Sequence, residues 1–154
     1  MTPRLRRLQA DADRLTAFLE GNQHIQLVEA VGTPSERYVL EYRLHGLMPG
    51  EDGSPRAGSV HRAEVFLPLD YPRRPPFCRM TTPVFHPNID PQKICIGDHW
   101  SAGQSLVELV VRIAQMICYQ SYNTQSPLNG LAAAWVTEHA EQVPLEAVDL
   151  AAGL

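Results

Sequence analysis

Hydrophobic residues first recur at helical spacing, from Leu5 to Leu19, with arginine and aspartate between them. Such a pattern places the apolar side chains on one face of a helix and the charged ones on the other. Thr2 followed by Pro3 is typical of a helix N-terminus, and Gly21 stands where a helix would end. The sequence therefore predicts an amphipathic helix between these two signals.

Strand-like segments follow, each apolar or alternating between apolar and polar residues, at 25–31, 38–44 and 60–67. The segment 49–55 is rich in proline, glycine and acidic residues and predicts a turn. Seven prolines between 68 and 91 exclude a helix there and leave room for only a short strand at 77–80. Short strands joined by turns favour an antiparallel meander.

Helical spacing returns at Ser105, which forms a capping box with Glu108 ahead of an apolar stripe. Ser126 and Pro127 are interpreted as the N-cap and first turn of a last helix. The tail 144–154 is expected to be frayed or to hold a short helix.

The fold class predicted is α+β, in a single domain over 1–154 with its core at about 3–140. The expected order is an N-terminal helix, a four-stranded antiparallel meander, an irregular segment and C-terminal helices.

Composition narrows the function classes. The chain has 44% hydrophobic and 19% charged residues and a net charge of −4, which fits a globular protein and gives no basic surface for nucleic acid. It has no apolar stretch long enough for a membrane span and no signal-peptide pattern. The three cysteines are odd in number and contain no Cys-x-x-Cys pair, so neither disulfides nor a metal site is expected. A cytoplasmic location is predicted.

The most informative stretch carries four short motifs in order: Tyr-Pro-Arg-Arg-Pro-Pro at 71–76, His-Pro-Asn at 86–88, Ile-Cys at 94–95 and Trp-Ser at 100–101. Together they resemble the ubiquitin-conjugating (E2) enzymes, and several ordered motifs are far more specific than one. The resemblance covers about residues 3–140. It implies the UBC-like fold and a cysteine that carries a ubiquitin-like protein as a thioester.

That cysteine is Cys95. A thiol carrier needs an accessible cysteine on a rigid, irregular segment, and the surrounding prolines and aromatic residues provide one. The thiolate is the reactive form of such a cysteine. Buried cysteines are common in protein cores, and we interpret Cys78 and Cys118 in this way.

The resemblance also assigns roles around Cys95. Asn88 stabilises the oxyanion that forms on the thioester or braces a neighbouring loop, although an Asn after a Pro also suits a plain turn. Ser126 helps to receive the attacking amine or only caps a helix, and Tyr122 and Asn123 belong to the same loop. His86 is expected to form structural hydrogen bonds.

Three further residues follow the cysteine closely. Asp98 and His99 relay a proton near the thiol or are exposed polar residues. Trp100 is expected to anchor the loop by packing.

Partners follow from the resemblance as well: an E1-like activating enzyme, the ubiquitin-like protein and a target protein. Arg4, Arg6 and Arg7 contact the E1-like enzyme or are plain surface. No cofactor is expected, because the E1-like partner uses the ATP. Arg73 and Ala102-Gly103 replace the apolar residue and the Pro-Ala that usually meet a RING ligase, which leaves dependence on such a ligase open.

The spacings from Asn88 to Cys95 and from Cys95 to Trp100 are shorter than is usual in the family. In this the chain resembles divergent bacterial E2-like proteins of ubiquitin-like conjugation operons, for which antiviral defence is a possible purpose by analogy. Two alternatives stay open: a UBC-fold module that only binds a ubiquitin-like protein or its E1, and a cysteine hydrolase using Cys95 with His86 or His99.

Overall fold

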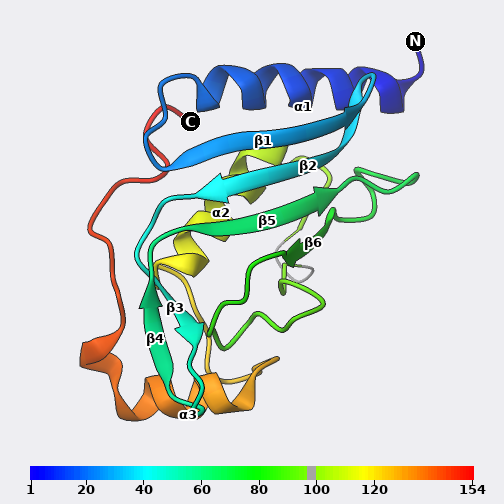
Figure 1. The fold of residues 1–154 in the computed structure, drawn as a ribbon. Coiled ribbons are helices and arrows are strands. Elements are labelled where there is room, and N and C mark those ends of the chain that lie inside the picture. Colours follow the sequence, from blue (N-terminus) through cyan, green and yellow to red (C-terminus); the bar gives the residue numbers. More distant parts are fainter. Residues whose placement is uncertain (97–99) are drawn as a thin grey trace.

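The computed structural model describes residues 1–96 and 100–154. Its first element, helix α1 (Pro3–Leu19), lies along the top of the molecule in Figure 1. The Thr2 hydroxyl oxygen caps the helix by accepting a hydrogen bond from the Leu5 N–H at 3.1 Å. Leu8 and Leu15 are fully buried, which confirms the predicted amphipathic pattern.

The sheet is the predicted four-stranded antiparallel meander. It consists of β1 (Ile25–Gly32), β2 (Ser35–Tyr42), β5 (His61–Phe66) and β6 (Phe77–Met80), paired in the order β1-β2-β5-β6. An additional hairpin, β3 (Gly46–Pro49) with β4 (Pro55–Gly58), lies between β2 and β5 in the chain. The turn predicted at 49–55 joins these two short strands, which were not predicted.

Helix α2 (Leu106–Ile117) packs behind the sheet, as Figure 1 shows, and most of its side chains are buried. Its N-cap is Ser105, whose hydroxyl oxygen accepts a hydrogen bond from the Glu108 N–H at 3.1 Å, as the capping signal predicted. The Tyr42 hydroxyl donates to the Val110 carbonyl oxygen at 3.0 Å and so ties β2 to the middle of the helix. The core lies between sheet and helix.

Helix α3 (Gly130–Glu138) begins later than predicted. Its N-cap is Asn129, whose side-chain oxygen accepts from the Ala132 N–H at 3.0 Å, so the prediction of Ser126 as the cap was wrong. The reason is tertiary: the Leu128 and Asn129 N–H groups both donate to the Pro87 carbonyl oxygen, at 2.8 and 3.0 Å. These bonds hold the chain before the helix against the His-Pro-Asn segment.

After the short 3-10 helix η2 (Ala140–Gln142), the tail runs back across the molecule and ends near the C-terminus of α1 (Figure 1). Leu150 is only 5% exposed and belongs to the main core. The Gln120 side-chain amide donates to the Glu146 and Val148 carbonyl oxygens at 2.8 Å. The tail is therefore an irregular segment docked on the fold, which differs from both arrangements predicted for it.

In the described part of the chain, no helix has the length and apolar character needed to cross a membrane.

Candidate functional site

Cys95 lies on an irregular segment whose backbone is fixed on both sides. The Ile94 N–H donates to the Cys78 carbonyl oxygen in β6 at 2.9 Å, and the Cys95 N–H donates to the Asn88 carbonyl oxygen at 3.0 Å. Ile94 and Ile96 are buried, whereas Cys95 between them stays partly exposed. The segment thus anchors itself by its isoleucines and leaves the thiol accessible.

The other two cysteines are core residues, as predicted. Cys78 is 2% exposed and Cys118 is fully buried. Burial raises the pKa of both thiols, because the interior disfavours the thiolate. Neither is therefore a good nucleophile.

Cys95 lines a cavity of about 260 Å³. The residues around this cavity come from the His-Pro-Asn segment, from α2 and from the loop after α2, and they are Asn88, Arg112, Met116, Ser121, Tyr122, Asn123 and Ser126. The structure thus brings together residues from two separate segments of the sequence, Asn88 with Cys95 and Tyr122 with Asn123 and Ser126. Arg112 and Met116 are additions that the motifs did not indicate.

Asn88 braces the loop after α2. Its side-chain nitrogen donates to the Asn123 carbonyl oxygen at 2.8 Å, and its side-chain oxygen accepts from the Asn123 N–H at 2.8 Å. Asn88 is 8% exposed, so these two bonds satisfy a nearly buried amide. Of the roles expected for this residue, bracing is the one whose contacts are formed in the structure.

His86 fixes the backbone of Asn88 by a hydrogen bond. Its Nδ1 accepts a hydrogen bond from the Asn88 N–H at 3.0 Å, so Nε2 carries the proton and donates to the Ser121 carbonyl oxygen at 3.2 Å. Burial lowers the pKa of His86 to about 4, which keeps the ring neutral. With both nitrogens bonded, His86 has none left to act as a base toward Cys95.

The loop 121–126 covers one side of the cavity with exposed polar side chains. Tyr122 is 41% exposed, and its ring lies 5.4 Å from that of Tyr119. Tyr119 has a left-handed backbone (φ 63°), and its hydroxyl donates to the Phe85 carbonyl oxygen at 2.5 Å. The turn that ends α2 is therefore held against the segment that carries His86. Ser126, at the end of the loop, does not cap α3, because Asn129 does.

Trp100 anchors the chain after the cysteine. Its indole N–H donates to the Pro72 carbonyl oxygen at 2.8 Å, and its ring lies 5.7 Å from that of Tyr71. Asp98 and His99 lie outside the described residues, so their roles stay predictions.

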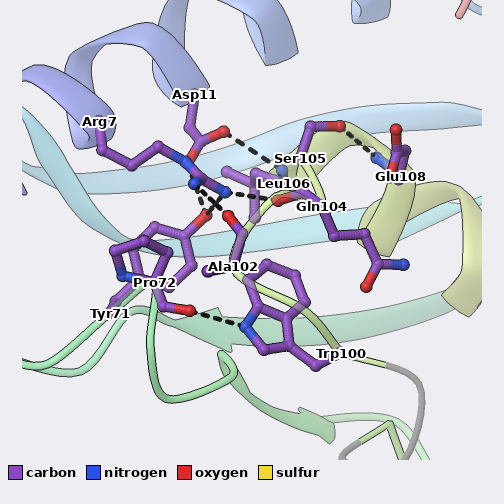
Figure 2. A network of polar contacts seen from close by, with 10 residues as sticks. All are labelled: Arg7, Asp11, Tyr71, Pro72, Trp100, Ala102, Gln104, Ser105, Leu106 and Glu108. Carbon is purple, nitrogen blue, oxygen red and sulfur yellow. Dashed lines mark hydrogen bonds and ion pairs between the residues drawn. The ribbon is translucent and has the colours of Figure 1, made fainter.

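A buried polar network lies beside this anchor (Figure 2). Its centre is Asp11, which is 2% exposed. The Asp11 carboxylate accepts hydrogen bonds from Arg7 Nε at 2.9 Å, from the Tyr71 hydroxyl at 2.5 Å and from the Leu106 N–H at 3.3 Å. Burial and the hydrogen bond to Asp11 raise the pKa of Tyr71, which therefore stays protonated and donates.

Arg7 extends the network to the loop before α2. Its guanidinium donates to the Ala102 carbonyl oxygen at 2.6 Å and also to the Gln104 carbonyl oxygen. The surface role predicted for Arg7 is thus replaced by an internal one. Arg4 is paired with Glu36 at 3.1 Å, and Arg6 is exposed. The spacing of Arg7 and Asp11, one helical turn apart, was the only sequence signal for this pair.

Within residues 1–96 and 100–154, no cluster of three or more histidine, cysteine or acidic side chains is arranged to hold a metal ion.

The helix, the meander and the fixed cysteine beside a braced loop define an α+β domain of the ubiquitin-conjugating type. Residues 25–148 match the family model of ubiquitin-conjugating enzymes. The chain therefore belongs to the ubiquitin-conjugating enzyme family.

Individual relatives agree with this assignment. Over 105 residues the chain is 34% identical to ubiquitin-conjugating enzyme E2 N of Drosophila melanogaster, which covers 65% of this chain and 68% of the relative. Over 80 residues it is 30% identical to ubiquitin-conjugating enzyme E2 1 of Schizosaccharomyces pombe, covering 49% and 37% of the two chains. A solved structure described as a ubiquitin conjugating enzyme from Trypanosoma cruzi has the same fold, with a TM-score of 0.65, 16% identity and coverage of 90% and 93%.

Proposed function

We propose that this protein accepts a ubiquitin-like protein from an E1-like activating enzyme as a thioester on Cys95, and that the cargo is then delivered to an amine of a target protein. The observation that carries the proposal is the partly exposed Cys95 in a cavity that is also lined by Asn88 and by the loop that Asn88 braces. The chain's family supports the same activity. The protein needs no cofactor of its own in this scheme, because the activating enzyme consumes the ATP. We propose that the protein acts in the cytoplasm.

In this scheme Asn88 holds the loop 121–126 beside the thioester through its two hydrogen bonds to Asn123. Ser126 and Tyr122, which are exposed at the cavity, contact the incoming acceptor. The relatives named above are animal, yeast and trypanosome proteins, so the resemblance to bacterial conjugation proteins and a role in antiviral defence stay predictions.

The test is to incubate the protein with ubiquitin, ubiquitin-activating enzyme and ATP, and to separate the products on a non-reducing gel. We expect a shifted band that thiols remove, that is absent in Cys95→Ala and that resists thiols in Cys95→Ser. Cys78 and Cys118 remain in both variants and serve as internal controls. If the activating enzyme becomes charged but wild-type protein shows no shift, the chain is a binding module and the proposal fails.

A further inference from the structure

We propose that Lys93 is a modification site on which this protein conjugates its own cargo, by transfer from Cys95 within one molecule. The site rests on the proposed function, because Cys95 must first carry the cargo as a thioester. Self-modification is thereby confined to one side chain, and the rest of the surface escapes it.

The choice of cations in this chain is unusual. Lysine is one of the commonest residues of globular proteins, yet of the 13 lysine and arginine residues here Lys93 alone is a lysine. An arginine keeps its proton in proteins, whereas the neutral amine of a lysine is a nucleophile. The 154 residues therefore contain one nucleophilic side-chain amine, and it stands two positions before Cys95.

Lys93 and Cys95 emerge on the same face of the cysteine segment. Ile94 and Ile96 are buried, at 3% and 5% exposure, whereas Lys93 is exposed and Cys95 is partly exposed. This alternation is that of an extended chain, in which side chains two positions apart share a face and their Cα atoms lie about 6.5 Å apart. The flexible four-carbon stem of a lysine can span such a separation.

The backbone that carries Lys93 is fixed by a closed turn. The Asp90 side-chain oxygen accepts hydrogen bonds from the Gln92 and Lys93 N–H groups at 2.8 and 2.9 Å. The Asp90 N–H donates to the Lys93 carbonyl oxygen at 3.0 Å, and the Cys95 N–H donates to the Asn88 carbonyl oxygen at 3.0 Å. All the contacts of Lys93 in this turn use its backbone, so a substitution of its side chain leaves them in place.

The transfer exchanges one acyl bond for another. The Lys93 amine, in its neutral form, attacks the thioester carbonyl carbon on Cys95. A carbon–nitrogen bond forms, the carbon–sulfur bond breaks, and Cys95 leaves as a thiolate. The nitrogen releases one proton to solvent, so that an isopeptide bond on Lys93 and a free Cys95 remain. Nothing is oxidised or reduced, and no further reactant is needed.

Tethering favours transfer within one molecule over transfer between two. A group held by a short flexible linker acts at an effective concentration in the millimolar range. At about 1 μM protein, the Lys93 of a second molecule is therefore at a disadvantage of about 10³. The rate constant of the transfer should accordingly not depend on protein concentration.

The site is tested by loading Cys95 with ubiquitin, removing the ATP and following the products on gels. We expect a thiol-resistant band to grow as the thiol-sensitive band decays, at a rate constant unchanged by dilution, and mass spectrometry to place the isopeptide on Lys93. Lys93→Arg should lose the thiol-resistant band while Cys95 still loads. A band that persists in Lys93→Arg, or a rate constant that falls on dilution, overturns the inference.

A double variant provides the matched control. Lys93→Arg with Arg56→Lys keeps the numbers of lysine and arginine and moves the amine to an exposed position on β4, in the hairpin that packs against α3 (Figure 1). We expect no thiol-resistant band from this variant. A band equal to that of wild type would show that any lysine of the chain suffices, and would overturn the assignment to Lys93.

A synthetic peptide thioester tests Lys93 without an activating enzyme. Thiol exchange places its acyl group on Cys95, and transfer then appears as a thiol-resistant mass increase on Lys93. Cys95→Ala, which keeps Lys93, should gain no such mass. If the activating enzyme fails to load Cys95, the proposed function fails, whereas the peptide thioester still decides the role of Lys93. An acyl group that stays on Cys95 until thiol removes it, or equal labelling of Cys95→Ala, overturns the inference.

Discussion

At the scale of single residues, His86 and Asn88 shape the cavity by binding backbone groups rather than other side chains. His86 holds the Ser121 carbonyl, and Asn88 holds both backbone groups of Asn123. Backbone atoms are present whatever side chain a position carries. The loop 121–126 can therefore vary in sequence while its path past Cys95 stays the same.

Replacing Asn88 with alanine removes both bonds to Asn123. We expect the free energy of unfolding to fall by about 1–3 kcal/mol, the usual cost of leaving nearly buried polar groups unpaired. Hydrogen exchange of the Asn123 amide should speed up, because its acceptor is lost. Ser121→Ala is the matched control, since Ser121 contributes only its carbonyl to the contacts with His86. Unchanged exchange at Asn123 in Asn88→Ala would contradict the bracing role.

The neutral state of His86 predicts a loss of stability in acid. Its pKa is about 4 in the folded protein, against about 6.5 for an unperturbed histidine. Between these values the unfolded chain binds more protons, so the free energy of unfolding falls as the pH drops, by about 2–3 kcal/mol from pH 7 to 4.5. Denaturant titrations of wild type and His86→Gln at both pH values measure this contribution.

His61 serves as the internal reference in that experiment. Burial lowers its pKa too, so it contributes a loss of the same sign to both proteins. Only the difference between wild type and His86→Gln belongs to His86. Equal losses in the two proteins would show that His86 does not titrate in this range.

The motifs predicted Asn88, Ser126 and the loop residues beside Cys95, but they did not indicate Arg112, which lines the same cavity. Arg112 occupies one polar position of an apolar helix, and a helical pattern shows only that such a position faces away from the core. Which surface it faces depends on the packing of α2 beside the cysteine segment. Asp11 was read as part of a solvated helix face for the same reason, because the hydroxyl and N–H groups it binds are distant in sequence.

At the scale of elements, the start of α3 tests which residue caps the helix that follows the loop 121–126. We expect Asn129→Ala to lower the free energy of unfolding by about 1 kcal/mol, because it removes the N-cap hydrogen bond to Ala132. Ser126→Ala should change it by less than about 0.5 kcal/mol, as for an ordinary surface substitution. Thermal or denaturant unfolding of the two variants separates the two capping sites. The reverse order would restore Ser126 as the cap.

The elements with strong periodicity were predicted with nearly correct bounds, and the others were not. Helices α1 and α2 combine a cap with an apolar stripe, and both signals are local. The hairpin of β3 and β4 has only four residues in each strand and includes Pro49 and Pro55, so neither alternation nor propensity indicated it. Its pairing depends on the chain returning along the same edge, which no short window of sequence contains.

At the scale of the whole molecule, the tail returns from α3 and packs Leu150 into the main core. We expect Leu150→Ala to lower the free energy of unfolding by about 2–5 kcal/mol, because a fully packed leucine is lost. Leu145→Ala, in an exposed part of the same tail, should cost less than about 0.5 kcal/mol. Denaturant unfolding compares the two variants. Similar small losses in both would mean that the tail contributes little to stability.

The position of Trp100 makes its fluorescence a candidate signal for the loading of Cys95. The chain has two tryptophans, and Trp135→Phe leaves Trp100 alone, five positions after Cys95 and fixed to Pro72. We expect a cargo attached to Cys95 to change the solvent around that indole, so that loading and discharge give opposite changes in fluorescence emission. Both steps could then be timed in a stopped-flow instrument without a dye on any partner. Cys95→Ala in the same background should give no signal.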